Sequence, residues 1–330
     1  MARQNPYRPF EPDPEQVALR PETSGNTVNG LGEDKFRRPR MVYWSPDPDK
    51  IAHGDMQQYF YRQSGKVPEF SASRAERQKI LDAALPDIAD TPAQRAPQDW
   101  TADLSQFVTA GDCERTGVAE LSPDWVFEGY EISQSRVIML GVQHDYDQIR
   151  NAPEPVAGLE VVAQYARAAV VSKTVAGWIR QQGWSAEPVT GPMTGALAMV
   201  PAALACGFGE LGKHGSIINP ELGASFRLSA VLTDAPFAPT PAQDFGIDDF
   251  CQNCRICEDA CPPEALFAEK QTVRGATKWY VDFDKCLPFF NQTHGCAMCI
   301  AVCPWSRPGV GLNLAAKLAR RAERQASQAS

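Results

Sequence analysis

The sequence predicts a mixed α/β (α+β) domain followed by a small cysteine-rich module. Residues 104–240 alternate between segments with the pattern of buried strands and segments with the pattern of helices. Eight of the ten cysteines lie between Cys251 and Cys303, a crowding that is typical of metal ligands and not of a disulfide framework. A chain of 330 residues, 43% hydrophobic and 22% charged, is long enough for about two such units.

The N-terminal segment, residues 1–103, is rich in proline, aspartate, arginine and glutamine. We expect most of it to be extended and to wrap around the core of the protein. One helix is predicted at about residues 72–85, because Ile80, Leu81 and Leu85 fall on one helical face.

The central domain is defined by two strands and two helices. Residues 136–142 (RVIMLGV) form a short run of apolar and β-branched residues, which predicts a buried strand. A helical pattern covers about residues 159–183 and ends at Gly183, a residue type that favours helix C-termini. A second helix is predicted at about residues 193–205, and residues 226–233 (FRLSAVLT) predict another strand. The order strand, helix, helix, strand suits an α/β or α+β domain.

The remaining chain divides into three parts. A proline-rich segment at about residues 236–244 predicts a semi-rigid linker. The cysteine-rich module occupies residues 245–310. The tail, residues 311–330, has helical propensity and a basic face.

The cysteine spacing matches that of bacterial ferredoxins with two [4Fe–4S] clusters. One run has the pattern C-x-x-C-x-x-C-x-x-x-C-P, and a second run keeps the end of that pattern. In such runs three cysteines bind one cluster and the fourth crosses to the other. The rule predicts Cys251, Cys254, Cys257 and Cys303 for cluster 1, and Cys261, Cys286, Cys296 and Cys299 for cluster 2. Zinc, which needs only four ligands at C-x-x-C spacing, is the alternative that this doubled pattern disfavours.

Charge and composition limit the expected partners. The net charge is −8 and the basic residues form no extended stripe, so binding to nucleic acid is not expected. The uncharged stretch at residues 188–209 contains several prolines and glycines, which argues against a membrane helix. The first residues lack the apolar segment of a signal peptide, so we expect a cytoplasmic protein.

A glycine-rich turn covers residues 207–215 and matches G-x-G-x-x-G over its first six residues. The helix that a nucleotide-binding turn would open is interrupted by Lys213, His214 and Gly215. Closely spaced backbone amides beside Lys213 suit an anionic ligand such as a phosphate. A plain tight loop explains the glycines equally well.

The same region carries a family resemblance. Residues 205–237 (ACGFGELGKHGSIINPELGASFRLSAVLTDAPF) resemble the corrinoid-binding segment of reductive dehalogenases. The resemblance continues through residues 137–155, 164–184, 188–191 and 303–308. The chain is therefore identified as a member of the superfamily that contains reductive dehalogenases and epoxyqueuosine reductases.

This resemblance implies a nitroreductase-like domain that holds base-off cobalamin, with a ferredoxin module that passes electrons to the cobalt. It implies that Tyr165 donates a proton and that Lys213 is the nearby cation that lowers the pKa of this tyrosine. None of the four histidines lies in a D-x-H-x-x-G motif, which would supply a lower cobalt ligand, and His144 is expected to be a hydrogen-bonded strand-end residue. The residues expected to bind the cofactor are Gly207, Gly209, Glu210, Leu211, Gly212, His214, Gly215, Ser216 and Asn219.

The implied activity is reductive cleavage of a carbon–halogen bond in a small organic halide, with an aromatic compound as the expected substrate. The enzyme would need a separate electron donor, such as a ferredoxin, a flavodoxin or a reductase. One alternative is an epoxyqueuosine reductase, although that family carries a catalytic acid where this sequence has Val170. The other alternative is an iron–sulfur electron-transfer protein without a working corrinoid.

Overall fold

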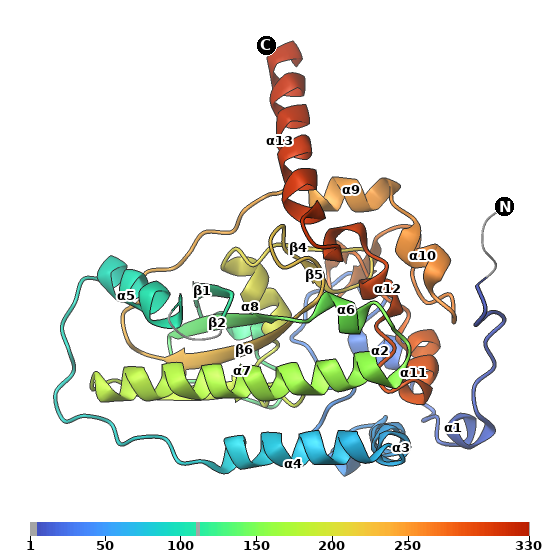
Figure 1. Cartoon of the computed structure of the whole chain (residues 1–330), viewed down its shortest axis with the longest axis horizontal. Helices are drawn as coiled ribbons and strands as arrows, with labels where there is room; N and C mark the ends of the chain where they lie inside the picture. Colours follow the sequence, from blue (N-terminus) through green and yellow to red (C-terminus); the bar gives the residue numbers. More distant parts are fainter. Residues whose placement is uncertain (1–4, 110–112, 330) are drawn as a thin grey trace.

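The computed structural model of the chain describes residues 5–109 and 113–329. A central antiparallel sheet has helices on both faces, and the cysteine-rich module lies at one end of it (Figure 1). The helices are α1 (Pro14–Ala18), α2 (Gly25–Asn29), α3 (Gly54–Gly65), α4 (Pro68–Asp82), α5 (Pro97–Thr109), α6 (Tyr146–Ile149), α7 (Pro155–Gln181), α8 (Met199–Ala205), α9 (Ile247–Asn253), α10 (Ile256–Ala260), α11 (Phe283–Gln292), α12 (Met298–Ala301) and α13 (Val310–Ala329). The strands are β1 (Arg115–Glu120), β2 (Arg136–Gln143), β3 (Ala186–Thr190), β4 (Glu210–Leu211), β5 (Ile217–Ile218), β6 (Phe226–Thr233), β7 (Gln271–Val273) and β8 (Ala276–Lys278).

The main sheet has the strand order β1-β2-β6-β3, and every neighbouring pair is antiparallel. The predictions of strands β2 and β6 are confirmed, and β6 has the predicted bounds. The two edge strands, β1 and β3, were not predicted from the sequence. β1 contains Gly117 and β3 contains Pro188, and both residues weaken the pattern of a strand. Proline is tolerated at the edge of a sheet, where its missing N–H leaves no ladder bond unmade.

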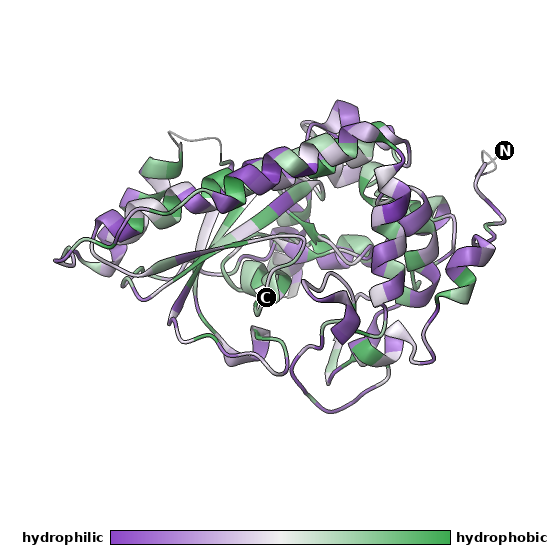
Figure 2. Ribbon diagram, turned by 90° about the horizontal axis from the view of Figure 1, so that it is seen from below, coloured by the Kyte–Doolittle hydropathy of each residue, from purple (hydrophilic) through white to green (hydrophobic). Residues whose placement is uncertain are grey.

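The sheet is buried on both faces. Ile138 and Leu140 of β2 pack with helices α5 and α7, whereas Val137 and Met139 pack with α8 on the opposite face. Successive side chains of a strand point to opposite faces, so a strand covered on both sides consists of an uninterrupted apolar run. Figure 2 shows hydrophobic residues along the central strands and mixed hydrophobic and hydrophilic residues along the outer helices.

Helix α7 runs the length of the sheet, and α4 packs against its outer side (Figure 1). The predicted long helix is thus confirmed, with an earlier start. Helix α8 begins six residues after the predicted start at residue 193. The helix cannot start earlier, because the backbone before it is hydrogen-bonded to another segment. Leu197 forms an isolated β-bridge with Val126, and the N–H of Ala198 donates to the Trp125 carbonyl.

The N-terminal region is more helical than predicted. Helix α4 covers most of the predicted helix at residues 72–85, but α3 was missed, although Met56, Tyr59 and Phe60 fall on one buried helical face. Before α3 the chain lies against the cysteine-rich module, where the Arg8 guanidinium donates to the Cys261 carbonyl at 2.6 Å. The Gln16 amide likewise donates to the Pro288 carbonyl at 3.0 Å.

Helix α13 follows the module and extends away from the body of the protein (Figure 1). Its first half packs through Leu314, Ala315 and Leu318 on a core that includes Cys251 and Trp305. Within the described part of the chain, no helix has both the length and the apolar character that a membrane span requires.

Candidate functional site

A cavity of about 190 Å³ lies where β6 begins, between the central domain and the cysteine-rich module. Its walls come from α7, the loop after β3, the start of α8, the 215–217 turn, β6 and α12. The lining residues are Tyr165, Gly191, Pro192, Thr194, Met199, Val200, Gly215, Ser216, Ile217, Ala224, Phe226, Arg227, Leu228 and Ile300. Ile300 directly follows Cys299, so the wall of this cavity adjoins the cysteine-rich module.

Tyr165 and Arg227 form the polar pair of this cavity. The Nη1 atom of Arg227 donates to the Tyr165 hydroxyl at 3.0 Å, and the guanidinium carbon lies 5.1 Å from the centre of the phenol ring. Gly191 lies against the same ring, where a Cβ atom would lie 2.6 Å from Cε1 of Tyr165. Any side chain at position 191 would therefore displace the tyrosine.

His144, which directly follows the central strand β2, positions Arg227. Its Nε2 atom accepts from Nε of Arg227 at 2.9 Å, and its Nδ1 atom lies 3.0 Å from Oγ of Ser225. A guanidinium can only donate, so the imidazole is neutral and carries its proton on Nδ1. Burial, followed by the charge of Arg227, holds the pKa of His144 well below its usual range. The structure confirms His144 as a hydrogen-bonded residue at the end of β2.

The N-terminal helices add a second cation beside Tyr165. Arg77 of α4 lies with its guanidinium carbon 5.9 Å from the centre of the Tyr165 ring, and Nη2 donates to the Gly191 carbonyl at 2.5 Å. Burial lowers the pKa of Arg77 and raises that of nearby Tyr61 of α3. The segment that was expected only to wrap the core therefore contributes side chains to the neighbourhood of Tyr165.

The resemblance implied that Lys213 is the cation beside Tyr165, and this prediction is wrong. The cation that donates to the Tyr165 hydroxyl is Arg227. Lys213 is buried, with 2% of its side chain exposed, and Nζ lies 2.5 Å from Oε1 of Glu258. Its ammonium also lies 5.0 Å from the centre of the Trp279 ring. Lys213 and His214 line the small cavity between cysteines of the module, so both face the predicted cluster 1 and not the phenol.

The glycine-rich turn is a tight loop that joins the two-stranded β4–β5 sheet. Gly209 has a φ of +134°, and a Cβ there would lie 1.9 Å from the Ile218 carbonyl oxygen. Glu210 accepts from the backbone N–H groups of three residues at the start of α9, and Asn219 accepts from Glu221 and Leu222 while donating to Phe208. The Glu210 carboxylate and the Asn219 amide therefore form hydrogen bonds within the fold. Among the nine residues predicted to bind the cofactor, Gly215 and Ser216 line the cavity of Tyr165, whereas Gly207, Gly209, Glu210, Leu211, Gly212, His214 and Asn219 do not.

The first set of cysteines surrounds one small cavity. Cys251, Cys254, Cys257 and Cys303 line it together. Burial raises the pKa of Cys251 to about 11 and the pKa values of Cys257 and Cys303 to about 12. Buried thiolates are costly without a compensating positive charge, and iron supplies such a charge. These residues therefore fit an iron–sulfur cluster.

The second set forms a separate group. Cys299 interacts electrostatically with Cys296, Cys286 and Cys261, and burial raises the pKa of each of these four thiols. Cys257 of the first set also interacts with Cys299, so the two sets lie near each other and their division between two clusters stays a prediction. Among the described residues, no group of three or more histidine, cysteine, aspartate or glutamate side chains has the arrangement that would hold a single metal ion. A cubane does not require such convergence, because each thiolate binds its own iron.

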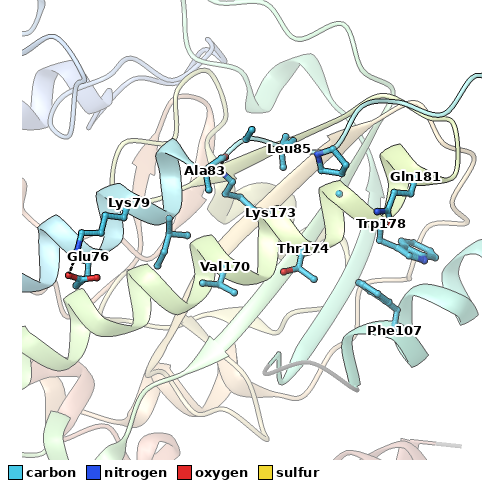
Figure 3. A pocket seen from close by; sticks show the side chains of 14 residues that line it. Glu76, Lys79, Ala83, Leu85, Phe107, Val170, Lys173, Thr174, Trp178 and Gln181 are labelled. Carbon is cyan, nitrogen blue, oxygen red and sulfur yellow. Dashed lines mark hydrogen bonds and ion pairs between the residues drawn. The ribbon is translucent and has the colours of Figure 1, made fainter.

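A second, more open groove of about 690 Å³ lies between α4 and α7. Figure 3 shows Val170, Thr174 and Trp178 of α7 facing it, together with the Glu76–Lys79 ion pair of α4. Val170 is 46% exposed and does not line the cavity of Tyr165. Position 170, where a catalytic acid would be expected in an epoxyqueuosine reductase, therefore faces away from that cavity.

Comparisons with known proteins agree with this arrangement. The family described as a 4Fe-4S dicluster domain matches residues 250–306, which include all eight clustered cysteines. The tetrachloroethene reductive dehalogenase of Desulfitobacterium hafniense is 32% identical over 219 residues, which cover 62% of this chain and 39% of that protein. The epoxyqueuosine reductase of Staphylococcus aureus is 34% identical over 121 residues, covering 32% of this chain and 31% of that protein. The chain thus spans about two fifths of the length of the dehalogenase.

Two solved structures share the fold. A reductive dehalogenase whose structure suggested a mechanism for B12-dependent dehalogenation superposes with a TM-score of 0.74 at 21% identity, covering 91% of this chain and 46% of the other. A catabolic reductive dehalogenase in complex with 3-bromo-4-hydroxybenzoic acid superposes with a TM-score of 0.72 at 19% identity, covering 92% and 48%. The chain is thus similar to reductive dehalogenases over 62% of its length, and its residues 250–306 match a 4Fe-4S dicluster domain.

Proposed function

We propose that the chain is a cobalamin-dependent oxidoreductase that reductively removes a halogen from a small organic halide. One turnover consumes two electrons and one proton, replaces the carbon–halogen bond with a carbon–hydrogen bond, and releases halide. The observation that carries this proposal is the cavity at the start of β6. It holds the hydrogen-bonded pair of Tyr165 and Arg227, and it is closed on another side by Ile300 of the dicluster domain.

The lining of this cavity fits one face of a corrinoid. Gly191, Pro192, Gly215, Ser216 and Ala224 have small side chains, which allow a flat ring system to approach the backbone closely. When bound, the cobalamin would supply a cobalt centre that reduces the carbon–halogen bond.

Electrons would reach this cavity through the dicluster domain. We assign Cys251, Cys254, Cys257 and Cys303 to one [4Fe–4S] cluster, because they line one small cavity, and Cys261, Cys286, Cys296 and Cys299 to the other, because Cys299 interacts with the other three thiols. Lys213 lies against the first set and Glu258 neutralises its charge. In this proposal Lys213 acts at the cluster and not on the proton donor.

The protein's own part in the reaction is the supply of a proton. Tyr165 points into the cavity and gives its hydroxyl proton to the carbon that loses the halogen. Arg227, which donates to the same oxygen at 3.0 Å, stabilises the phenolate that remains. His144 holds Nε of Arg227 and so fixes the direction of the guanidinium. The phenol is then reprotonated from solvent before the next turnover.

The alternative of epoxyqueuosine reduction is supported less well. The residue at the position of that family's acid is Val170, and its side chain lies in the groove between α4 and α7. The net charge of −8 also disfavours a tRNA substrate, because the phosphate backbone is bound mainly by lysine and arginine.

The proposal is tested with protein that has been loaded anaerobically with iron, sulfide and cobalamin and then reduced. The first probe is 3-bromo-4-hydroxybenzoic acid, and the measured quantity is bromide released per chain, with bromoalkanes and halogenated ethenes as further probes. Bromide release that requires both cofactors supports the proposal. A protein that binds both cofactors but releases halide from none of the three substrate classes contradicts it.

A further inference from the structure

We propose that two buried ring N–H groups, on Trp305 and His214, donate hydrogen bonds to the sulfur atoms of cluster 1 and raise its reduction potential. This inference rests on the proposed function, because it needs an iron–sulfur cluster among the first set of cysteines. It deepens that function by naming residues other than the cysteines that set how readily this cluster accepts an electron.

Trp305 lies in the wall of the small cavity that the first set of cysteines lines. The residue is 2% exposed, and its ring packs edge-on against Phe250 with 5.6 Å between the ring centres. Its Nε1 atom has no hydrogen-bond partner among the described residues. An indole N–H can only donate, and a buried donor without an acceptor costs free energy. The indole therefore suits an acceptor that is bound in this cavity.

His214 is also buried and lines the same cavity. Its Nδ1 atom accepts a hydrogen bond from the backbone N–H of Ser216 at 3.2 Å, so Nδ1 carries no proton. The proton of the ring is then on Nε2. The Nε2 atom, like Nε1 of Trp305, has no partner among the described residues. The backbone thus selects the tautomer that leaves a second N–H group for an acceptor in this cavity.

The neighbouring polar side chains are already paired. The Lys213 ammonium forms an ion pair with Glu258, which offsets its positive charge. Trp279 lies in the same apolar core as Trp305, but its Nε1 atom donates to Oδ1 of Asp248 at 2.8 Å. Of the two tryptophans in this core, the one that lines the cavity is the one whose N–H is unpaired.

Hydrogen bonds to the sulfur atoms of an iron–sulfur cluster change its reduction potential. Reduction adds one negative charge to the cluster, so an N–H donor stabilises the reduced form more than the oxidised form. Loss of one donor should lower the equilibrium constant for one-electron reduction by about tenfold, which corresponds to about 59 mV in midpoint potential.

The first test is a redox titration of the full chain with reconstituted clusters, followed by EPR. Dithionite supplies one electron to each cluster, which passes from the 2+ to the 1+ state. Trp305→Phe removes the N–H group and keeps an aromatic ring, and it should lower one of the two midpoint potentials by about 59 mV. Trp279→Phe is the matched control, because it makes the same change in the same core at an indole that is bonded to Asp248. We expect this control to leave both potentials unchanged.

His214→Leu and His214→Gln form a second matched pair. Both variants lose the Nδ1 atom that accepts from Ser216, but glutamine keeps an N–H group at about the place of Nε2. The leucine variant should lower the same potential as Trp305→Phe does, and the glutamine variant should restore most of that loss. Equal potentials in the leucine and glutamine variants would contradict donation from Nε2.

A measurement on the wild type does not depend on the stability of any variant. Tryptophan labelled with ¹⁵N in the indole ring is incorporated into the chain, and the reduced clusters are studied by pulsed EPR. We expect a ¹⁵N hyperfine coupling in the wild type and in Trp279→Phe, and its loss in Trp305→Phe. Absence of this coupling from the wild type would overturn the proposal for Trp305. Unchanged potentials in Trp305→Phe and His214→Leu at full iron content would overturn the whole proposal.

Iron content and halide release separate this inference from the function on which it rests. If the wild type holds both clusters and no substitution moves a potential, this inference alone fails. If the potentials move as predicted but the loaded protein releases no halide, the proposed activity fails and the two donors stand. If the wild type holds no iron–sulfur cluster, both fail.

Discussion

Replacing Arg227 with glutamine removes the group that joins Tyr165 to His144. Two hydrogen bonds are lost, from Nη1 to the Tyr165 hydroxyl at 3.0 Å and from Nε to Nε2 of His144 at 2.9 Å. A hydrogen bond that involves a charged group contributes about 1.5–3 kcal/mol. If the contact with the phenol oxygen acts only as the proton leaves, this loss falls on the barrier, where about 1.4 kcal/mol corresponds to a factor of ten in rate. The expected loss of turnover is therefore about 10-fold to 150-fold.

The assay for this variant is bromide release from 3-bromo-4-hydroxybenzoic acid under reducing, anaerobic conditions. The iron content should equal that of the wild type, because no cysteine is changed, and the corrinoid content is measured on the same sample so that turnover is given per bound corrinoid. Arg227→Lys keeps the charge but cannot reach both partners, so it should fall between the wild type and Arg227→Gln. Arg150→Gln is the matched control, because its side chain is 61% exposed and lies outside the cavity. Wild-type turnover in Arg227→Gln with full cofactor content would refute this role for Arg227.

Four further predictions concern single groups. Tyr165→Phe should leave iron and corrinoid contents unchanged while halide release collapses, and normal turnover would remove this tyrosine from the mechanism. Cys254→Ser should deplete iron and the EPR signal of the reduced clusters, whereas unchanged iron would contradict the ligand assignment. Burial holds the pKa of His144 well below its usual range, so the unfolded chain takes up a proton first as the pH falls below about 6.5. The melting temperature of the wild type should therefore fall between pH 7 and pH 5, and that of His144→Gln should fall less. Equal falls in melting temperature over this pH range would refute this role of His144. Lys213→Met should destabilise the fold, because buried Glu258 then keeps only the exposed Arg255 as an ionic partner. Adding Glu258→Leu should restore most of the loss in thermal unfolding, and no recovery in the double variant would contradict this role of the pair.

Much of the central domain follows from local sequence patterns. Strand β6 was predicted with its final bounds, because a run of apolar and β-branched residues permits few other structures. The edge strands β1 and β3 were missed because their pattern is broken and because antiparallel pairing depends on contacts between distant segments. Helix α3 was missed because polar residues and glycine surround its apolar positions. Local composition therefore predicts the interior of the sheet better than its edges.

The site was predicted only in part for a similar reason. Lys213 was predicted to be the cation near Tyr165 because it lies in the glycine-rich turn, but its side chain forms an ion pair with Glu258 beside the cysteines. Arg227 lies in an otherwise apolar strand, and it contacts Tyr165 across 62 positions of the sequence. A charged residue at the second position of a buried strand was the signal that could have identified it. The division of the cysteines between two clusters follows from the crossing pattern of such runs and stays a prediction.

The most direct measurement of the central claim is the metal and corrinoid content of the protein after anaerobic loading with iron, sulfide and cobalamin. Iron analysis and the corrinoid absorption spectrum on one sample give both numbers per chain. We predict about eight irons, from two [4Fe–4S] clusters, and about one corrinoid. Eight irons without any corrinoid would contradict the proposed reductase and leave an iron–sulfur electron-transfer protein. Zinc in place of iron would contradict the clusters themselves.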